Sequence, residues 1–221
     1  MKRIDQIAKL MLNNQLLIDI GCDHGYLGIN ALNQKKVKLV WNVEISAYAL
    51  ENCYHNYAKV NLLDQVSFWH SDGFEKLPHD YHQSATLVCA GIGSKTILKI
   101  LSNVPNYVDQ IILLSHTLAY ELRQWATNHH WYVFNEVMVS DYNKIYELIY
   151  LVKNNHLSQL QYQNQTEFWF GLKQFYHHPS NWDHFCLYWK QQKTKLLKIP
   201  VTKLSCQQKK LLALITEQLY D

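Results

Sequence analysis

The 221-residue chain has little proline, little glycine and no long apolar run. Its four prolines and seven glycines are too few for a collagen-like fibre, and 48% hydrophobic residues exclude a disordered tail because they supply a packed core. No stretch reaches the roughly 18 consecutive apolar residues that a membrane span needs, and the first residues show no signal-peptide pattern. We therefore expect a cytoplasmic protein of one ordinary domain plus an appendage, with no membrane partner.

Cysteine pairs are also missing from the sequence. The five cysteines are scattered and form no C-x-x-C pair, and no cluster of cysteines or acidic residues completes a zinc site with the histidines. We expect free, mostly buried thiols and no bound metal.

Net charge is only +3, which by itself does not indicate a nucleic-acid partner. Positive charge is concentrated in residues 155–221, which hold eight lysines against four acidic residues. Such an arm suits phosphate contacts, although a solvated lysine-rich helix face has the same composition.

Up to residue 152, short apolar runs alternate with helical patterns. The periodicity predicts strands at 16–20, 37–43, 66–69, 86–90, 110–114, 131–139 and 145–152, and helices at 3–12, 26–33, 46–59, 94–101 and 117–128. Alternating strands and helices build a parallel sheet with helices on both faces, an α/β fold of the Rossmann-like kind. The turn at 140–143 is too short for a crossover helix, so the last two strands are expected to form an antiparallel hairpin at one edge.

Residues 155–221 have a different pattern, and we place a domain boundary between 154 and 155. Pro179 is expected to end one segment, and Ser180 or Asn181 to cap a helix. The apolar positions of this helix are Trp182, Phe185, Cys186, Trp189, Leu196 and Leu197. A second amphipathic helix follows Pro200, so 1–154 is predicted to be the sheet domain and 155–221 a coiled-coil-like helical hairpin.

The segment after the first strand carries the clearest chemical signal. Asp19 comes near the end of a buried run, and Gly21 and Gly25 follow in a tight turn before a helix. Dinucleotide-binding proteins have G-x-G-x-x-G here, whereas this chain has Asp23 at the middle position, where a carboxylate repels a diphosphate. A ligand with a cationic centre and one carboxylate fits better, and S-adenosylmethionine is such a ligand.

Two further acidic residues follow neighbouring strands. Glu44 comes 25 residues after Asp19, the spacing of an acid that accepts hydrogen bonds from ribose hydroxyls. Asp72 is placed to accept the adenine amino group, with Phe74 or a neighbouring apolar residue over the ring. Strand-end carboxylates often cap helices instead, but the combination predicts an S-adenosylmethionine site.

The segment after the fourth strand, residues 90–95, is where a methyl acceptor is expected. No two prolines are adjacent, so the Asn/Asp-Pro-Pro-aromatic signature of methyltransferases that act on exocyclic amines is missing. No cysteine stands in the context of a covalent C5-pyrimidine nucleophile either.

The first turn, Ile18-Asp19-Ile20-Gly21-Cys22-Asp23-His24-Gly25-Tyr26-Leu27, resembles the D-I-G-S-D-H-A-Y-L signature of the bacterial tRNA adenine-N1-methyltransferases that modify position 22. Segments 43–45, 71–75, 90–94, 123–125, 135–137 and 145–148 are also similar to that family, and the likeness covers nearly the whole chain. After the fifth strand the family usually has Q-P-N, where this chain has Ser115-His116-Thr117, and Ser94 replaces a glycine.

The resemblance implies transfer of a methyl group from S-adenosylmethionine to adenine N1 in the D-arm region of tRNA, by a protein expected to be a monomer. Asp23 is then the first candidate to stabilise the positive charge of the methylated ring, with His24 and Tyr26 positioning base or cofactor. The expected cofactor contacts are Asp19, Gly21, Cys22, Gly25, Glu44, Ile45, Asp72, Gly73, Ala90 and Gly91. The expected RNA contacts are Arg3, Lys190, Lys193, Lys195, Lys198 and Lys203.

Other interpretations stay open from the sequence. Asp23 can merely cap the following helix, and His24 can be a structural hydrogen-bonding residue. For the function, the alternatives are a nicotinamide-dependent oxidoreductase, which Asp23 disfavours, and a non-catalytic RNA-binding protein that keeps the cofactor pocket for stability.

Overall fold

The computed structural model describes residues 2–142 and 144–219. Its strands are β1 (Leu16–Ile20), β2 (Leu39–Glu44), β3 (Val66–His70), β4 (Ala85–Ile92), β5 (Val108–Ser115), β6 (Tyr132–Asp141) and β7 (Lys144–Val152). Its helices are α1 (Lys2–Leu10), α2 (Tyr26–Asn33), α3 (Ala47–Lys59), α4 (Ser94–Leu101), α5 (Tyr120–Asn128), α6 (Gln165–Phe170), α7 (Lys173–Tyr176), α8 (Pro179–Leu197) and α9 (Cys206–Gln218). In this described part, no helix combines the length and the apolar character needed to cross a membrane.

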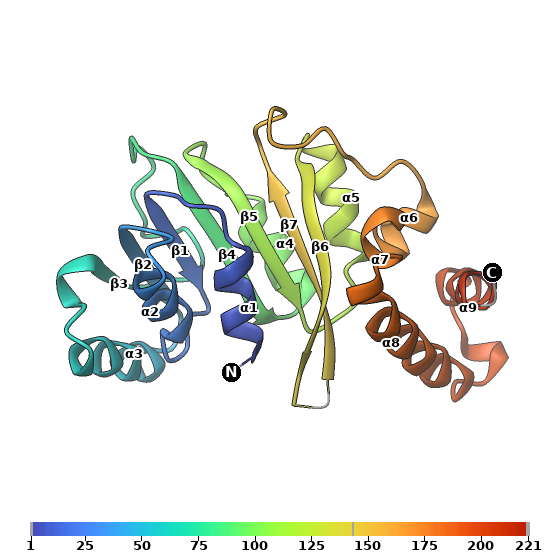
Figure 1. Cartoon of the computed structure of the whole chain (residues 1–221). Coiled ribbons are helices and arrows are strands. Elements are labelled where there is room, and N and C mark those ends of the chain that lie inside the picture. Colours follow the sequence, from blue (N-terminus) through green and yellow to red (C-terminus); the bar gives the residue numbers. More distant parts are fainter. Residues whose placement is uncertain (1, 143, 220–221) are drawn as a thin grey trace.

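The strands form one sheet in the order β3-β2-β1-β4-β5-β7-β6, and α8 and α9 lie beyond its β6 edge (Figure 1). Strands β1 to β5 pair in parallel, whereas β7 runs antiparallel to both β5 and β6. The predicted α/β sheet with an antiparallel edge hairpin is therefore confirmed. The strand order reverses between β1 and β4, and at such a point the loops at the carboxyl ends of the strands leave a ligand crevice.

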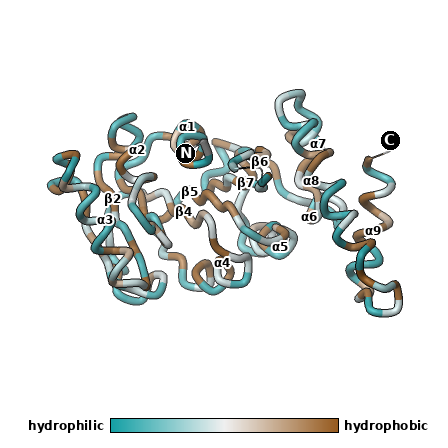
Figure 2. The backbone as a smooth tube through the Cα atoms, turned by 90° about the horizontal axis from the view of Figure 1, so that it is seen from below, coloured by the Kyte–Doolittle hydropathy of each residue, from teal (hydrophilic) through white to brown (hydrophobic). Residues whose placement is uncertain are grey.

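Helices cover both faces of the sheet because both faces are apolar. Alternate side chains of β1 enter different cores: Leu16 and Ile18 pack with α4 and α5, whereas Leu17 packs with α1, α2 and α3. Figure 2 shows α1 and α2 on one side of the strands and α4 and α5 on the other. Asp19 follows Leu17 by two residues and so points to the side of α1 to α3, at the end of β1 where the crevice opens.

A third apolar cluster joins the edge hairpin to the C-terminal helices. Tyr120 of α5 and Met138 of β6 belong to it. Its members from α6 to α9 and their connections are Trp169, Phe170, Tyr176, Phe185, Tyr188, Trp189, Leu196, Leu204, Leu211 and Ile215. Trp189 and Ile215 are completely buried, so apolar packing holds α8 against α9 and against β6.

Three details of the C-terminal prediction are wrong. Pro179 does not end a segment but is the first residue of α8, where its missing N–H costs nothing, and the cap is His178, whose side chain accepts a hydrogen bond from Ser180 N–H. Leu197 is 62% exposed and does not belong to the apolar face. The short helices α6 and α7 were not predicted, because six and four residues contain too few turns to show a periodicity.

A buried ion network fixes the C-terminal segment to the sheet. Arg123 on α5 donates from Nε to Glu136 Oε1 at 2.9 Å and from Nη2 to Glu147 Oε1 at 2.7 Å. It also donates to the main-chain oxygen of Trp169 at 2.9 Å, and Tyr188 of α8 donates its hydroxyl to Glu147 Oε2 at 3.1 Å. The three charged side chains are at most 8% exposed, so each depends on its partners to compensate for lost hydration.

Candidate functional site

A cavity of about 560 Å³ opens at the carboxyl ends of β1, β2 and β4. It lies at the crevice that the strand order creates, and its volume is within the range of small-ligand sites. The predicted site residues that line it are Arg3, Asp19, Gly21, Cys22, Asp23, His24, Tyr26, Glu44, Ile45, Asp72, Gly73, Ala90 and Gly91. The fold thus brings residues from separate segments of the sequence to one place.

Left-handed backbone conformations shape the turn between β1 and α2. Gly21 has φ +78°, Asp23 +50° and Gly25 +71°. Gly25 does not line the cavity but makes the turn possible, because a Cβ there would stand 2.4 Å from Cys53 Sγ and 2.7 Å from the Tyr57 ring. Gly25 is also the N-cap of α2, without any side-chain cap, so the interpretation of Asp23 as a helix cap is wrong.

Asp19 is the buried member of a group of three carboxylates. It is 4% exposed, and burial, followed by the charges of Glu44 and Asp23, raises the pKa of Asp19 to about 7. Negative charge is therefore crowded at this end of the cavity, and a bound cation would relieve it. A sulfonium amino acid brings such a cation, whereas a diphosphate would add to the repulsion.

Main-chain amides hold Glu44 in the cavity wall. Its Oε1 accepts hydrogen bonds from Ile45 N–H at 2.9 Å and Ser46 N–H at 3.1 Å, and its Oε2 accepts one from Asp23 N–H at 3.4 Å. A carboxylate has about four acceptor positions, so the fixed side chain keeps capacity for a ribose hydroxyl.

Asp72 and the apolar wall complete the predicted cofactor site. Lys99 Nζ lies 2.5 Å from Asp72 Oδ2, so an adenine amino group bound here shares this carboxylate with Lys99. The expectation for Phe74 is wrong, because this side chain is 3% exposed in the core below α4 and does not line the cavity. Ile45 and Ile100 are apolar residues of the wall instead. Glycine turns, carboxylates and apolar side chains together fit S-adenosylmethionine.

The predicted catalytic residues lie in the outer part of this wall. The Asp23 side chain is 72% exposed, and its Oδ1 is 3.7 Å from His24 Nε2. The rings of His24 and Tyr26 have centroids 5.5 Å apart and are tilted by 38°. Because these side chains combine exposure with a place in the cavity wall, a large substrate can reach them from solvent.

Comparison with known proteins assigns a family to this arrangement. Residues 17–219 match the family model of TrmK, tRNA (adenine(22)-N(1))-methyltransferase. The chain belongs to this family. The match includes both the turn between β1 and α2 and the C-terminal helices, so the TrmK assignment does not rest on the sheet alone.

Individual relatives agree with the TrmK assignment. The structure of M. capricolum TrmK with S-adenosyl-homocysteine is 27% identical with a TM-score of 0.85, and the match covers 98% of this chain and 96% of that one. The tRNA (adenine(22)-N(1))-methyltransferase of Bacillus subtilis is 25% identical over 151 residues, which is 67% of this chain and 63% of that protein. Protein MG248 of Mycoplasma genitalium is 32% identical over 154 residues, 69% of each chain.

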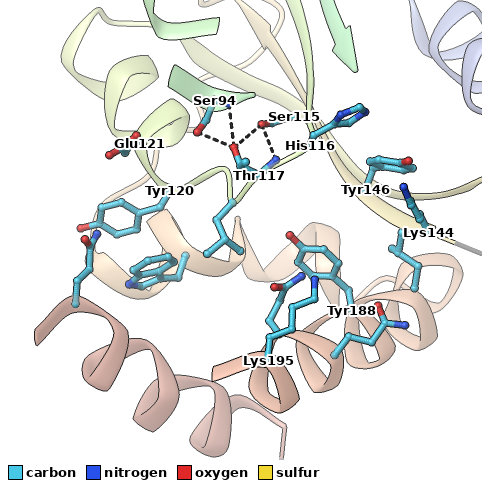
Figure 3. A pocket seen from close by; sticks show the side chains of 16 residues that line it. Ser94, Ser115, His116, Thr117, Tyr120, Glu121, Lys144, Tyr146, Tyr188 and Lys195 are labelled. Carbon is cyan, nitrogen blue, oxygen red and sulfur yellow. Dashed lines mark hydrogen bonds between the residues drawn. The ribbon is translucent and has the colours of Figure 1, made fainter. Parts of the chain in front are cut away.

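The end of β5 and the loop after it, where this TrmK chain has Ser115-His116-Thr117, are tied to the start of α4 by hydroxyl groups (Figure 3). Thr117 Oγ1 accepts a hydrogen bond from Ser94 N–H at 2.9 Å and donates to Ser94 Oγ at 2.8 Å. Ser115 Oγ lies 3.1 Å from Thr117 Oγ1. The serine that replaces a glycine is thus the partner of the threonine in the changed loop. His116 lines the candidate cofactor cavity, and the sequence analysis gave it no role. The signal in the sequence was that this loop differs from the Q-P-N of the family.

The predicted RNA-binding lysines lie apart from the candidate cofactor cavity, on α8 and in the connection to α9. Of these, Lys190, Lys195, Lys198 and Lys203 are exposed and Lys193 is partly buried. Lys195 lines a second cavity, which borders the first. Contact between these lysines and RNA stays a prediction.

Proposed function

We propose that this protein performs the reaction of its family, the transfer of a methyl group from S-adenosylmethionine to N1 of adenine 22 in tRNA, giving 1-methyladenosine. The observation that carries the proposal is the cavity at the end of β1, where buried Asp19 and hydrogen-bonded Glu44 leave negative charge beside glycine turns. Such a cavity suits a sulfonium amino acid linked to a ribose, and it disfavours the diphosphate of a nicotinamide cofactor.

The chemistry explains which groups the protein needs. Neutral adenine has a lone pair on N1, so the acceptor requires no strong base. S-adenosylmethionine supplies an electrophilic methyl group. The protein takes the base out of the stack, aligns N1 and stabilises the positive charge that the ring gains. Asp23 provides that stabilisation, because its carboxylate stands in the cavity wall and is open to solvent.

Each remaining site residue has a place in this proposal. Glu44 binds the ribose hydroxyls, Asp72 binds the adenine amino group of the cofactor, and His24 and Tyr26 position the target base. Arg3 and the lysines of α8 meet tRNA phosphates in the D-arm region. We further propose that the protein acts as a cytoplasmic monomer, with residues 1–154 as the catalytic part and 155–221 as the RNA-binding part.

A methylation assay tests the reaction. A tRNA transcript with adenine at position 22 is incubated with the enzyme and S-adenosylmethionine and then digested to nucleosides. We expect 1-methyladenosine, and none when adenine 22 is replaced by guanine. Product appearing only as N6-methyladenosine, or no product on any tRNA, would defeat the proposal. Calorimetry with S-adenosylmethionine and with NAD separates it from the oxidoreductase alternative, for which NAD alone should bind.

Substitution of Asp23 separates an enzyme from a non-catalytic RNA-binding protein. Asp23→Ala should lower kcat by at least about tenfold, since a preorganised charge beside the reacting group is lost. The affinity for S-adenosylmethionine should change less than kcat, because Asp19 and Glu44 stay in the cavity to hold the donor. Unchanged kcat in Asp23→Ala would contradict the catalytic role.

A further inference from the structure

A second cavity, of about 720 Å³, lies between the loop after β5, the beginning of β7 and α8. Figure 3 shows Lys144 and Tyr146 on one side of it, Tyr120 and Glu121 on the opposite side, and Lys195 projecting from α8. Its wall therefore combines aromatic rings with cationic side chains. Sites for single-stranded nucleic acid use this combination, because the rings stack on bases and the cations meet phosphates.

His116 stands where the two cavities meet, since it lines both. The centroid of its ring is 5.7 Å from that of Tyr146, with a tilt of 35°. The guanidinium carbon of Arg3 lies 5.4 Å from the same Tyr146 centroid. A Cβ on Gly91 would stand 3.6 Å from His116 Nε2, so the imidazole reaches the glycine that borders the cofactor cavity.

The main chain fixes the position of this imidazole. His116 N–H donates to Ile92 O at 3.0 Å, and the residues on either side of it belong to the hydroxyl network with Ser94. Burial, followed by the charges of Arg3 and Lys144, lowers the pKa of His116 below its usual value of 6.5. The neutral form of the ring therefore predominates at pH 7, and a neutral flat ring can stack on an adenine that gains positive charge without repelling it.

We propose that the target adenine stacks on His116 at this junction, and that the adjoining nucleotide occupies the second cavity with its phosphate beside Lys195 and Lys144. The carboxylate of Glu121 does not repel the phosphate in this arrangement, because Glu121 lies on the far side of the cavity from Lys144 (Figure 3). The inference rests on the proposed function, which supplies both the tRNA and the methyl donor.

The role of the ring is tested by comparing His116→Ala with His116→Phe. Base stacking on an aromatic ring is worth enough to change binding at least about fivefold. His116→Ala should lower kcat/KM for tRNA by about tenfold, while the Kd for S-adenosylmethionine stays within about twofold of wild type. His116→Phe keeps a flat neutral ring and should recover activity to within about threefold of wild type.

The phosphate contact is tested with Lys195→Gln and a matched control, Lys209→Gln. Lys209 is exposed on α9 and does not line the second cavity. Lys195→Gln should weaken tRNA binding and reduce the slope of log Kd against log salt by about one, the change expected for one lost phosphate contact. Lys209→Gln should leave both quantities as in wild type.

The outcomes distinguish this inference from the proposed function. If wild type methylates no tRNA adenine, the proposed function fails and the inference fails with it. If wild type is active but His116→Ala has unchanged kcat/KM, or His116→Phe is as impaired as His116→Ala, stacking on His116 is overturned alone. Equal effects of Lys195→Gln and Lys209→Gln would overturn the assignment of the phosphate to the second cavity.

Discussion

The pH dependence of cofactor affinity tests the charge balance of the site directly. Without a ligand, burial and the neighbouring carboxylates of Glu44 and Asp23 raise the pKa of Asp19 to about 7. A cation bound in the same cavity favours the ionised carboxylate, and so brings the pKa of Asp19 back toward its ordinary value of 3.8. Below pH 7, binding therefore has to release the Asp19 proton, and affinity should rise with pH.

The magnitude follows from the titration of Asp19. With a pKa of about 7, about 3% of Asp19 is ionised at pH 5.5 and about 60% at pH 7.2. The Kd for S-adenosylmethionine should therefore fall about twentyfold over this interval, which is roughly 2 kcal/mol. Calorimetry at pH 6 in two buffers of different ionisation enthalpy should also detect the release of about one proton per bound cofactor.

Asp19→Asn is the matched variant, because an amide keeps the shape of the side chain and cannot ionise. Its Kd should be the same from pH 5.5 to 7.2. Its ligand-free form should also be more stable than wild type above pH 7. In wild type the free energy of unfolding decreases as pH rises from about 4 to about 7, because Asp19 ionises at a lower pH in the unfolded state than in the folded state. A pH-independent Kd in wild type, or an unchanged slope in Asp19→Asn, would refute this reasoning.

Three further substitutions probe the site and its support. Glu44→Ala should weaken S-adenosylmethionine binding by about 1–3 kcal/mol, through lost charge-assisted hydrogen bonds; calorimetry showing equal affinity would exclude Glu44 as the ribose ligand. Arg123→Met leaves two glutamates buried without their ion-pair partner, so it should lower the free energy of unfolding by about 3–5 kcal/mol and Tm by roughly 6–20 °C. The control Lys99→Met breaks an exposed ion pair and should barely change Tm. Similar Tm values for the two variants would contradict the argument that burial makes the Arg123 pairs important. Gly25→Ala should lower Tm because the added Cβ collides with Cys53. Apart from the chain neighbours, no described atom lies within 4 Å of a Cβ added at Gly93, so Gly93→Ala should not lower Tm; equal Tm values for the two variants would show that the turn at Gly25 relaxes.

Elements with an uninterrupted pattern were predictable from the sequence to the residue. The bounds of β1, α2 and α4 are those predicted, because a wholly buried strand and regular apolar spacing leave few alternatives. The start of α5 was predicted at Thr117 but lies at Tyr120. Thr117 is engaged with Ser94 and Ser115 across the loop, and that pairing depends on two strands that come together only in the folded protein.

The position of the candidate cofactor cavity was predictable because the carboxyl ends of parallel strands must meet at one edge of the sheet. This rule places Asp19, Glu44 and Asp72 together without any knowledge of side-chain packing. It does not say which side chains turn inward, so it failed for Phe74, which is buried in the core. The rule also gives no information about the buried contacts of Arg123, because its partners lie between 13 and 46 residues further along the chain.

That Arg123 network bears on how the C-terminal helices reach the site. Tyr188 of α8 is bonded to Glu147 of β7, and Lys195 follows Tyr188 by about two helical turns, on the same face of α8. Glu147 in turn follows Tyr146, which lines the second cavity. Both α8 and β7 thus carry a residue that anchors α8 and a residue of the proposed RNA site. The anchoring contact therefore sets the distance between Lys195 and the junction of the two cavities at His116. Deleting everything beyond residue 160 would remove the hydrogen bonds of Trp169 and Tyr188 to the Arg123 network and expose its charges, so this deletion tests folding. Lys195→Gln leaves the anchor intact and tests RNA binding alone.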